Sequence, residues 1–223
     1  GINGGSLEKD IKAKYGGATA QALAESAMRS VAALERENFH DIVVSVKSSD
    51  VRICVEAYRE LDKVCAYPLH IGVTESGGGE GAVIKSTAGI ASLLLDGIGD
   101  TVRVSLTGDP VREIEVGRSI LHAVGLDDDY VEVVSCPTCA RCFYDLESLA
   151  ARCREMTRGV RKRLKVAVMG CVVNGPGEAS DADIGIAGGK DKAVLFSCGR
   201  ITETLPVAEA ENKFLAMLGD LLR

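Results

Sequence analysis

A repeat of about thirty residues in the first part of the chain constrains its fold more than any other feature. Short β-branched runs begin near positions 41, 69, 101 and 130, and stretches of helical character follow the first three. Asp50 and Asp109 stand at N-cap positions of two of these stretches. A strand, a turn and a helix need about this length, so the repeat predicts an α/β fold of parallel strands with helical crossovers. The expected strands are 41–46, 68–73, 101–106 and 130–134, and the expected helices are 50–65, 86–95 and 109–124.

The pattern extends beyond this repeat on both sides. Residues 19–38 form a strongly helical window, which completes an earlier unit whose strand we expect at or before Gly1. The acidic run 127–129 marks a boundary, after which the spacing changes. We therefore expect two domains, 1–128 and 129–223. In the second domain we expect helices at 145–158 and 207–222 and further strands at 164–168, 183–187 and 193–197.

Composition excludes several classes of protein. The 223 residues are 46% hydrophobic and 26% charged, which is typical of a globular chain. The net charge of −6 argues against a nucleic acid or an anionic membrane as partner. No apolar run approaches the ~18–20 residues that span a bilayer, and no basic segment precedes an apolar one. We expect a cytoplasmic protein with no membrane segment and no signal peptide.

Clustered cysteines are the strongest chemical signal. Cys136 and Cys139 lie three residues apart, Cys142 repeats the spacing, and Cys171 follows a predicted strand inside the glycine-rich segment 170–178. Thiolates from two neighbouring loops suit an iron–sulfur cluster or a structural zinc, and spacing alone leaves both open. The remaining cysteines are isolated, and we expect most of them to be small buried side chains: Cys54, Cys65, Cys153 and Cys198.

A second set of polar residues follows the predicted parallel strands. Lys47, Glu75, Arg103 and Ser105 stand at or near the carboxyl ends of three of them. Ligands of α/β folds bind at this edge. Cations and a hydroxyl there suit phosphates, and a carboxylate suits proton transfer. The alternative is that Lys47 and Glu75 are loop charges that pair with each other.

Five strings of this sequence together closely resemble the bacterial 4-hydroxy-3-methylbut-2-enyl diphosphate synthases, the iron–sulfur reductases of the methylerythritol phosphate route to isoprenoids. The most specific is Cys-Val-Val-Asn-Gly-Pro-Gly-Glu at 171–178. The resemblance implies a TIM-type barrel followed by a small α/β iron–sulfur domain of the sulfite and nitrite reductase type. The family's barrel has eight strands, so we expect a carboxyl-terminal part of a longer protein with about the last three of them and the stub of a fourth. The strings are 45–50, 72–75, 97–106, 136–139 and 170–178.

The resemblance also implies a set of site residues. It implies a four-iron four-sulfur cluster held by Cys136, Cys139, Cys171 and Glu178, which makes Cys142 a bystander. Glu75 would donate a proton to the leaving hydroxyl. Glu178 would be catalytic as well as a ligand, because an oxygen ligand is more easily displaced from iron than a thiolate. The implied substrate contacts are Asn3, Lys47, Arg103, Ser105 and Asn174.

The implied reaction is reductive ring opening and dehydroxylation of 2-C-methyl-erythritol 2,4-cyclodiphosphate to 4-hydroxy-3-methylbut-2-enyl diphosphate. The family implies flavodoxin or ferredoxin as electron donor, a homodimer, and a bacterial cytoplasm or the plastid stroma of a plant or alga. Several of the family's phosphate-binding arginines would lie in the missing part, so the isolated chain is not assured of activity. The alternative function is a non-catalytic, zinc-stabilised α/β binding module. That module would need Cys142 as a ligand.

Overall fold

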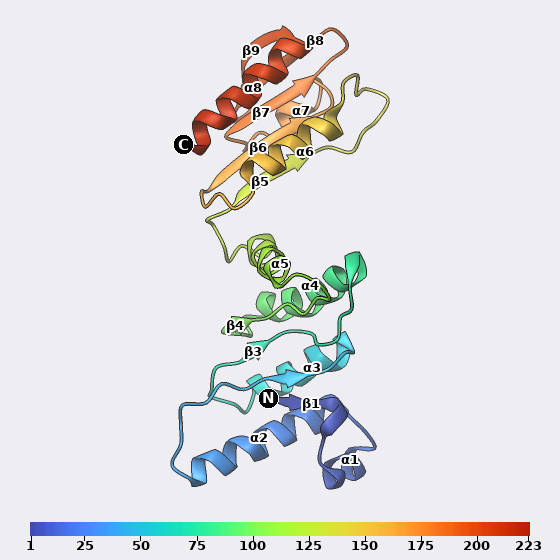
Figure 1. Ribbon diagram of the computed structural model, residues 1–223, viewed down its shortest axis with the longest axis vertical. Helices are drawn as coiled ribbons and strands as arrows, with labels where there is room; N and C mark the ends of the chain where they lie inside the picture. The colour runs from blue at the N-terminus through green and yellow to red at the C-terminus, as the bar shows by residue number, and fades with distance from the viewer. The chain divides into compact units, whose positions relative to one another are not determined.

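The computed structural model describes residues 1–223, and the chain forms two compact units, Gly1–Asp127 and Asp128–Arg223. Each unit combines helices with parallel strands, and two antiparallel strands extend the sheet of the second unit (Figure 1). The mixed α/β class predicted from the sequence is therefore confirmed. No helix has the length and apolar character needed to cross a membrane.

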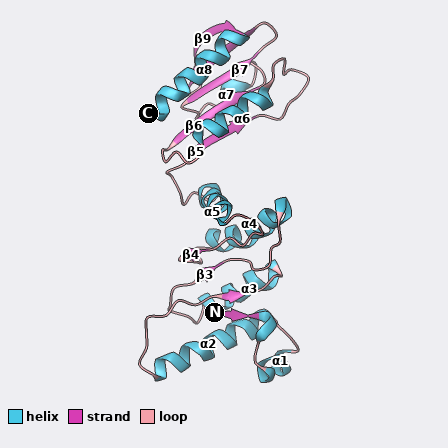
Figure 2. Ribbon diagram, viewed as in Figure 1, coloured by secondary structure: helices cyan, strands magenta, loops and turns pink.

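The first unit consists of four very short strands followed by helices (Figure 2). Strands β1 and β2 pair in parallel, as do β3 and β4, and a parallel bridge between Val44 and Leu69 connects the two pairs. Four parallel strands thus lie in sequence order, and the short β1 next to Gly1 is the stub of a fourth strand that the sequence predicted beside three others. The elements are β1 Ile2–Asn3, η1 Gly4–Ser6, α1 Lys9–Tyr15, α2 Ala20–Arg36, β2 Val46–Lys47, α3 Val51–Asp62, β3 His70–Ile71, α4 Gly79–Leu95, β4 Thr101–Val102 and α5 Pro110–Ala123.

Alternation along the strands separates an apolar side from a polar one. Val46 and Ile71 are fully buried in the main apolar core of this unit, together with residues of α2, α3 and α4. Their neighbours Lys47 and His70 point the other way, because successive strand residues face opposite sides. Ser45 shares the side of Lys47. The side of the strands away from the helices is therefore lined by polar groups.

Helix boundaries in the first unit follow their caps. Asp50 and Asp109 are the N-caps of α3 and α5, and their carboxylates accept from Ile53 N at 3.0 Å and Val111 N at 2.9 Å, as predicted. Helix α4 begins at Gly79 rather than at residue 86. Residues 79–85, which include two glycines, form its first turns, where Glu80 complements the positive end of the helix dipole.

The second unit is a five-stranded sheet in the order β5-β6-β7-β8-β9. Strands β5, β6 and β7 are parallel, and β8 and β9 extend the sheet antiparallel. Helices α6 and α8 cover one face (Figure 1). The sequence missed β9 because this edge strand is mostly exposed and carries few apolar residues. The elements are β5 Val131–Ser135, α6 Leu146–Thr157, β6 Leu164–Met169, α7 Gly175–Glu178, β7 Ile184–Gly188, β8 Lys192–Ser197, β9 Arg200–Pro206 and α8 Val207–Leu222.

Gly188 at the end of β7 packs directly on the Tyr144 ring. A Cβ at Gly188 would lie 2.2 Å from that ring, whose hydroxyl donates to Met169 O at 2.8 Å. Gly188→Ala is therefore expected to lower the free energy of unfolding by about 1–3 kcal/mol through overpacking, measured by thermal and chemical unfolding. Gly219→Ala, in α8 with only an ordinary contact to Met156, is expected to preserve or raise stability. Equal effects of the two substitutions would contradict this reading.

Candidate functional site

Asn3 and Lys47 are brought together at the carboxyl ends of β1 and β2. Their Cα atoms are register partners in the parallel pair. The Asn3 carboxamide accepts from Gly5 N at 2.9 Å and caps the turn that follows β1. The Lys47 side chain extends toward β1, because a Cβ at Gly1 would lie 3.7 Å from Lys47 Cε. Lys47 is therefore directed to the β1 side rather than toward the loop of Glu75 after β3.

Arg103 supplies the clearest sign of an anion site. It follows β4, its backbone N–H donates to Ile71 O at 2.9 Å, and its side chain lies across Gly72, where a Cβ would be 2.6 Å from Arg103 Cγ. Its Nε and Nη2 atoms are buried and have no hydrogen-bond partner. A buried guanidinium with unused donors is costly, and phosphate or carboxylate oxygens are the partners that satisfy it best. Ser105, half-buried, follows two residues later on the same side.

Glu75 lies in the exposed loop that leaves β3. Its φ of +54° is in the left-handed region, which non-glycine residues rarely adopt. Such backbone strain is found at binding and catalytic positions more often than elsewhere. Because Glu75 follows β3, it lies at the same carboxyl-terminal edge of the strands as Lys47 and Arg103.

The cysteines of the second unit gather at one edge of its sheet. Cys136 follows β5 and Cys171 follows β6, and these strands are parallel neighbours. The Gly170 N–H donates to Cys136 Sγ at 3.0 Å. A Cβ at Gly170 would lie 3.2 Å from Cys142 Sγ and 3.3 Å from Cys136 Sγ, so a side chain here would press against both thiols. The glycine both supplies a donor to sulfur and allows the thiols to approach.

Glu178 is tied to Cys171 through the short helix α7. Gly175 N donates to Cys171 O at 3.0 Å, and Glu178 N donates to Asn174 O at 2.8 Å. Glu178 and Cys136 also line one pocket, together with Lys165 and Met169 among others. The structure thus brings Cys136, Cys171, Asn174 and Glu178 to the same sheet edge.

Arg141 is a residue of this edge that sequence reasoning missed. Hydrogen bonds from its backbone and side chain lower the pKa of the exposed Cys139 thiol. The bond to Cys139, with the charges of Cys171 and Glu178, raises the pKa of Arg141 in turn. The sequence did show a positively charged residue between Cys139 and Cys142, which could have identified it.

Cys136 and Cys142 approach each other beside Gly170, but no third ligand joins them. No group of three or more His, Cys, Asp or Glu side chains in either unit is placed to hold one metal ion. A structural zinc draws four ligands around one ion, whereas a cubic cluster takes each ligand at a different iron. Cys142 Sγ donates to the backbone at Tyr144 O at 3.4 Å, which suits a thiol that is not a metal ligand. Thiolates and a carboxylate from two neighbouring loops are donors that an iron–sulfur cluster can use.

The isolated cysteines divide by burial. Cys54 and Cys153 are fully buried and Cys65 is half-buried. Cys198 is exposed, in the turn between β8 and β9, and is the exception to the expectation that most of these cysteines are buried. Its left-handed φ of +47° belongs to a tight hairpin turn at the surface.

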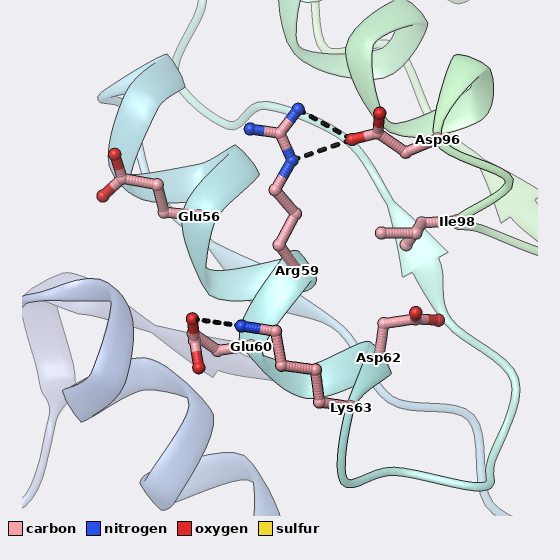
Figure 3. A pocket seen from close by; sticks show the side chains of 7 residues that line it. All are labelled: Glu56, Arg59, Glu60, Asp62, Lys63, Asp96 and Ile98. Atoms are coloured by element: carbon pink, nitrogen blue, oxygen red, sulfur yellow. Dashed lines mark hydrogen bonds and ion pairs between the residues drawn. The ribbon is translucent and has the colours of Figure 1, made fainter.

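A separate groove lies on the helical side of the first unit (Figure 3). It is lined by the end of α3 and by the segment between α4 and β4, and Arg59 Nη2 pairs with Asp96 at 2.7 Å. Segments that lead into strands lie at the amino ends of the sheet. Residues at this end of a barrel serve stability rather than chemistry. The groove is therefore distinct from the Lys47 and Arg103 edge.

The family model described as the GcpE TIM-barrel domain matches residues 1–118, and that of the GcpE protein C-terminal domain matches residues 132–220. The chain belongs to the GcpE family. One relative, from Caldanaerobacter subterraneus subsp. tengcongensis, is 56% identical over 90% of this chain and 57% of its own length. Another, from Ruminiclostridium cellulolyticum, is 48% identical over 99% of this chain and 63% of its own length. Both are named 4-hydroxy-3-methylbut-2-en-1-yl diphosphate synthase (flavodoxin). This chain thus spans about three fifths of their length.

Proposed function

We propose that this GcpE-family chain acts in the reductive ring opening of 2-C-methyl-erythritol 2,4-cyclodiphosphate to 4-hydroxy-3-methylbut-2-enyl diphosphate. The relatives carry the name of this synthase. The observation that carries the proposal is the pair of buried guanidinium nitrogens of half-buried Arg103, Nε and Nη2, which have no hydrogen-bond partner at a carboxyl-terminal strand edge. A substrate with two phosphoryl groups supplies the acceptor oxygens that this group lacks.

The first unit binds and orients the diphosphate. Arg103 offers a planar pair of donors to phosphoryl oxygens, and Lys47 adds a point charge from the neighbouring part of the edge. Ser105 and Asn3 contribute short polar side chains that fix the orientation of the ring. Together these residues hold the diphosphate against the polar side of the strands.

Glu75 is the proton donor for the hydroxyl that leaves. A carboxylic acid can protonate a leaving oxygen when it lies within hydrogen-bond reach of that oxygen. The strained loop after β3 presents this side chain to solvent on the substrate edge. Water would otherwise have to supply the proton without fixed geometry.

Cys136, Cys139, Cys171 and Glu178 would hold a four-iron four-sulfur cluster in the second unit, a domain of the sulfite and nitrite reductase type. Such a cluster supplies electrons singly and a Lewis-acidic iron. The Gly170 N–H donates to Cys136 Sγ and Arg141 lowers the pKa of Cys139, and contacts of this kind orient and support thiolates that bind a metal. Asn174, before α7, adds a polar group beside the carboxylate ligand.

The partners follow from the same proposal. Two electrons must reach the site one at a time, which suits flavodoxin or ferredoxin as the donor. The relatives named above carry flavodoxin in their names. A homodimer, in which the two edges come from different subunits, is part of the proposal on the strength of the family resemblance.

Anaerobic reconstitution with iron and sulfide tests the cluster. We expect about four irons per chain and broad visible absorption. Cys142→Ser should keep the full iron content, because that thiol is already committed to Tyr144 O. Stoichiometric zinc without iron uptake, or loss of metal in Cys142→Ser, would instead support the zinc-stabilised binding module.

A further inference from the structure

Strands β2 and β3 are joined by a regular ladder only at their amino ends. Val44 N donates to Pro68 O at 2.9 Å, and His70 N donates to Val44 O at 2.8 Å. Bonds in a parallel ladder recur every two residues along each strand. The next one would run from Val46 N to His70 O.

The hydroxyl of Tyr58 occupies the place of that missing bond. It accepts from Val46 N at 3.2 Å and donates to His70 O at 2.6 Å. Tyr58 is completely buried and belongs to α3, the helix that connects these two strands. The connecting helix thus inserts an oxygen between the two strands it joins.

Cys54, one helical turn earlier on α3, repeats the arrangement two residues further along the strands. Its Sγ donates to Gly72 O at 3.7 Å and accepts a hydrogen bond from the Ser48 backbone. A regular ladder would pair these two backbone groups directly. Beyond them the strands meet again through a long contact of 3.4 Å between Thr74 N and Ser48 O.

Both inserted groups keep their protons at neutral pH. Burial raises the pKa of the Tyr58 hydroxyl to about 12 and that of the Cys54 thiol to about 11, and the nearby charge of Arg103 opposes both shifts. A protonated hydroxyl or thiol can donate and accept at once. Each group can therefore serve one amide and one carbonyl, as the geometry requires.

We propose that Tyr58 and Cys54 form a wedge of positioning residues that holds β2 and β3 apart and so sets the spacing between Lys47 and Glu75. Lys47 directly follows Val46, and Glu75 directly follows Thr74, so each lies next to a backbone group at the opened stretch. Arg103 crosses Gly72 in the same stretch, which places the anion site over the gap. The inference deepens the proposed function, because it concerns the residues that bind the cyclic diphosphate there.

Tyr58→Phe tests the wedge, since it removes one oxygen and keeps the buried ring. Crystal structures and ¹⁵N-resolved amide shifts of the unsubstituted and substituted chains report whether Val46 N closes onto His70 O. Calorimetric titration with 2-C-methyl-erythritol 2,4-cyclodiphosphate reports binding. We expect the strands to close, the Val46 amide shift to change, and affinity to fall by about tenfold or more through misplacement of charged groups.

Tyr67→Phe is the matched control. It removes a hydroxyl bonded to Glu35 at the amino side of β3, and we expect neither strand spacing nor affinity to change. Cys54→Ala repeats the test at the second inserted group if Tyr58→Phe folds poorly. Unchanged spacing, or closed strands with unchanged affinity, would overturn the wedge. Failure of the unsubstituted chain to bind the cyclodiphosphate would overturn the proposed function, whereas strand spacing would still decide whether the wedge exists.

Discussion

Cys171→Ala is expected to reduce iron in the reconstituted chain from about four atoms to fewer than one, with loss of the visible absorption. The substitution removes one of three thiolates that would hold the cluster. The fold around it should persist, because the bond from Gly175 N uses the Cys171 backbone oxygen rather than its sulfur. Colorimetric iron analysis after desalting, with the visible spectrum and far-ultraviolet circular dichroism, measures all three points.

Cys198→Ser is the control for this substitution. Cys198 is exposed in the turn between β8 and β9, so its loss is expected to leave iron content unchanged. Retention of full iron in Cys171→Ala would remove Cys171 from the ligand set. Loss of helical signal together with iron would point to a general folding defect, and Cys139→Ala, on an exposed loop, would then replace it as the test.

Helices in which apolar residues recur at a regular helical spacing were predictable from the sequence. Helices α3, α5 and α8 lie where the periodicity placed them, because their apolar faces must be buried against strands whatever the details of the loops. Helix α1 and strand β9 were missed. Helix α1 is short and has no side-chain cap, and β9 is an exposed edge with little to bury. The spacing of apolar residues therefore predicts an element poorly when that element buries few side chains.

The candidate sites were predictable in part. Strand order alone brings Lys47, Glu75 and Arg103 to one edge, since carboxyl ends of parallel strands meet there. Spacing identified the cysteine string but gave no reason to prefer Glu178 over Cys142, which came from the family resemblance alone. The role of Tyr58 was invisible in the sequence, because an aromatic side chain at helical spacing normally indicates core packing. The role of its hydroxyl can be recognised only from the two backbone groups that it bonds, Val46 N and His70 O.

Arg103→Met is expected to change stability and binding in opposite directions. The buried Nε and Nη2 atoms have no partner in the unliganded chain, so they weaken the fold. Methionine keeps much of the side-chain volume without the orphaned donors. We expect the free energy of unfolding to rise by about 1–3 kcal/mol, measured by chemical denaturation.

The same substitution should weaken binding of 2-C-methyl-erythritol 2,4-cyclodiphosphate by about 100-fold, because a buried charge contact to phosphate is lost. Arg103→Lys should recover only part of this affinity, since an ammonium keeps the charge but not the planar pair of donors. Arg59→Met serves as the control: it breaks the ion pair with Asp96 on the helical side, so it should leave affinity unchanged and give no gain in stability. A stabilised Arg103→Met chain with full affinity would show that the orphaned guanidinium serves some other anion, and a destabilised one would show that the arginine supports the fold rather than the site.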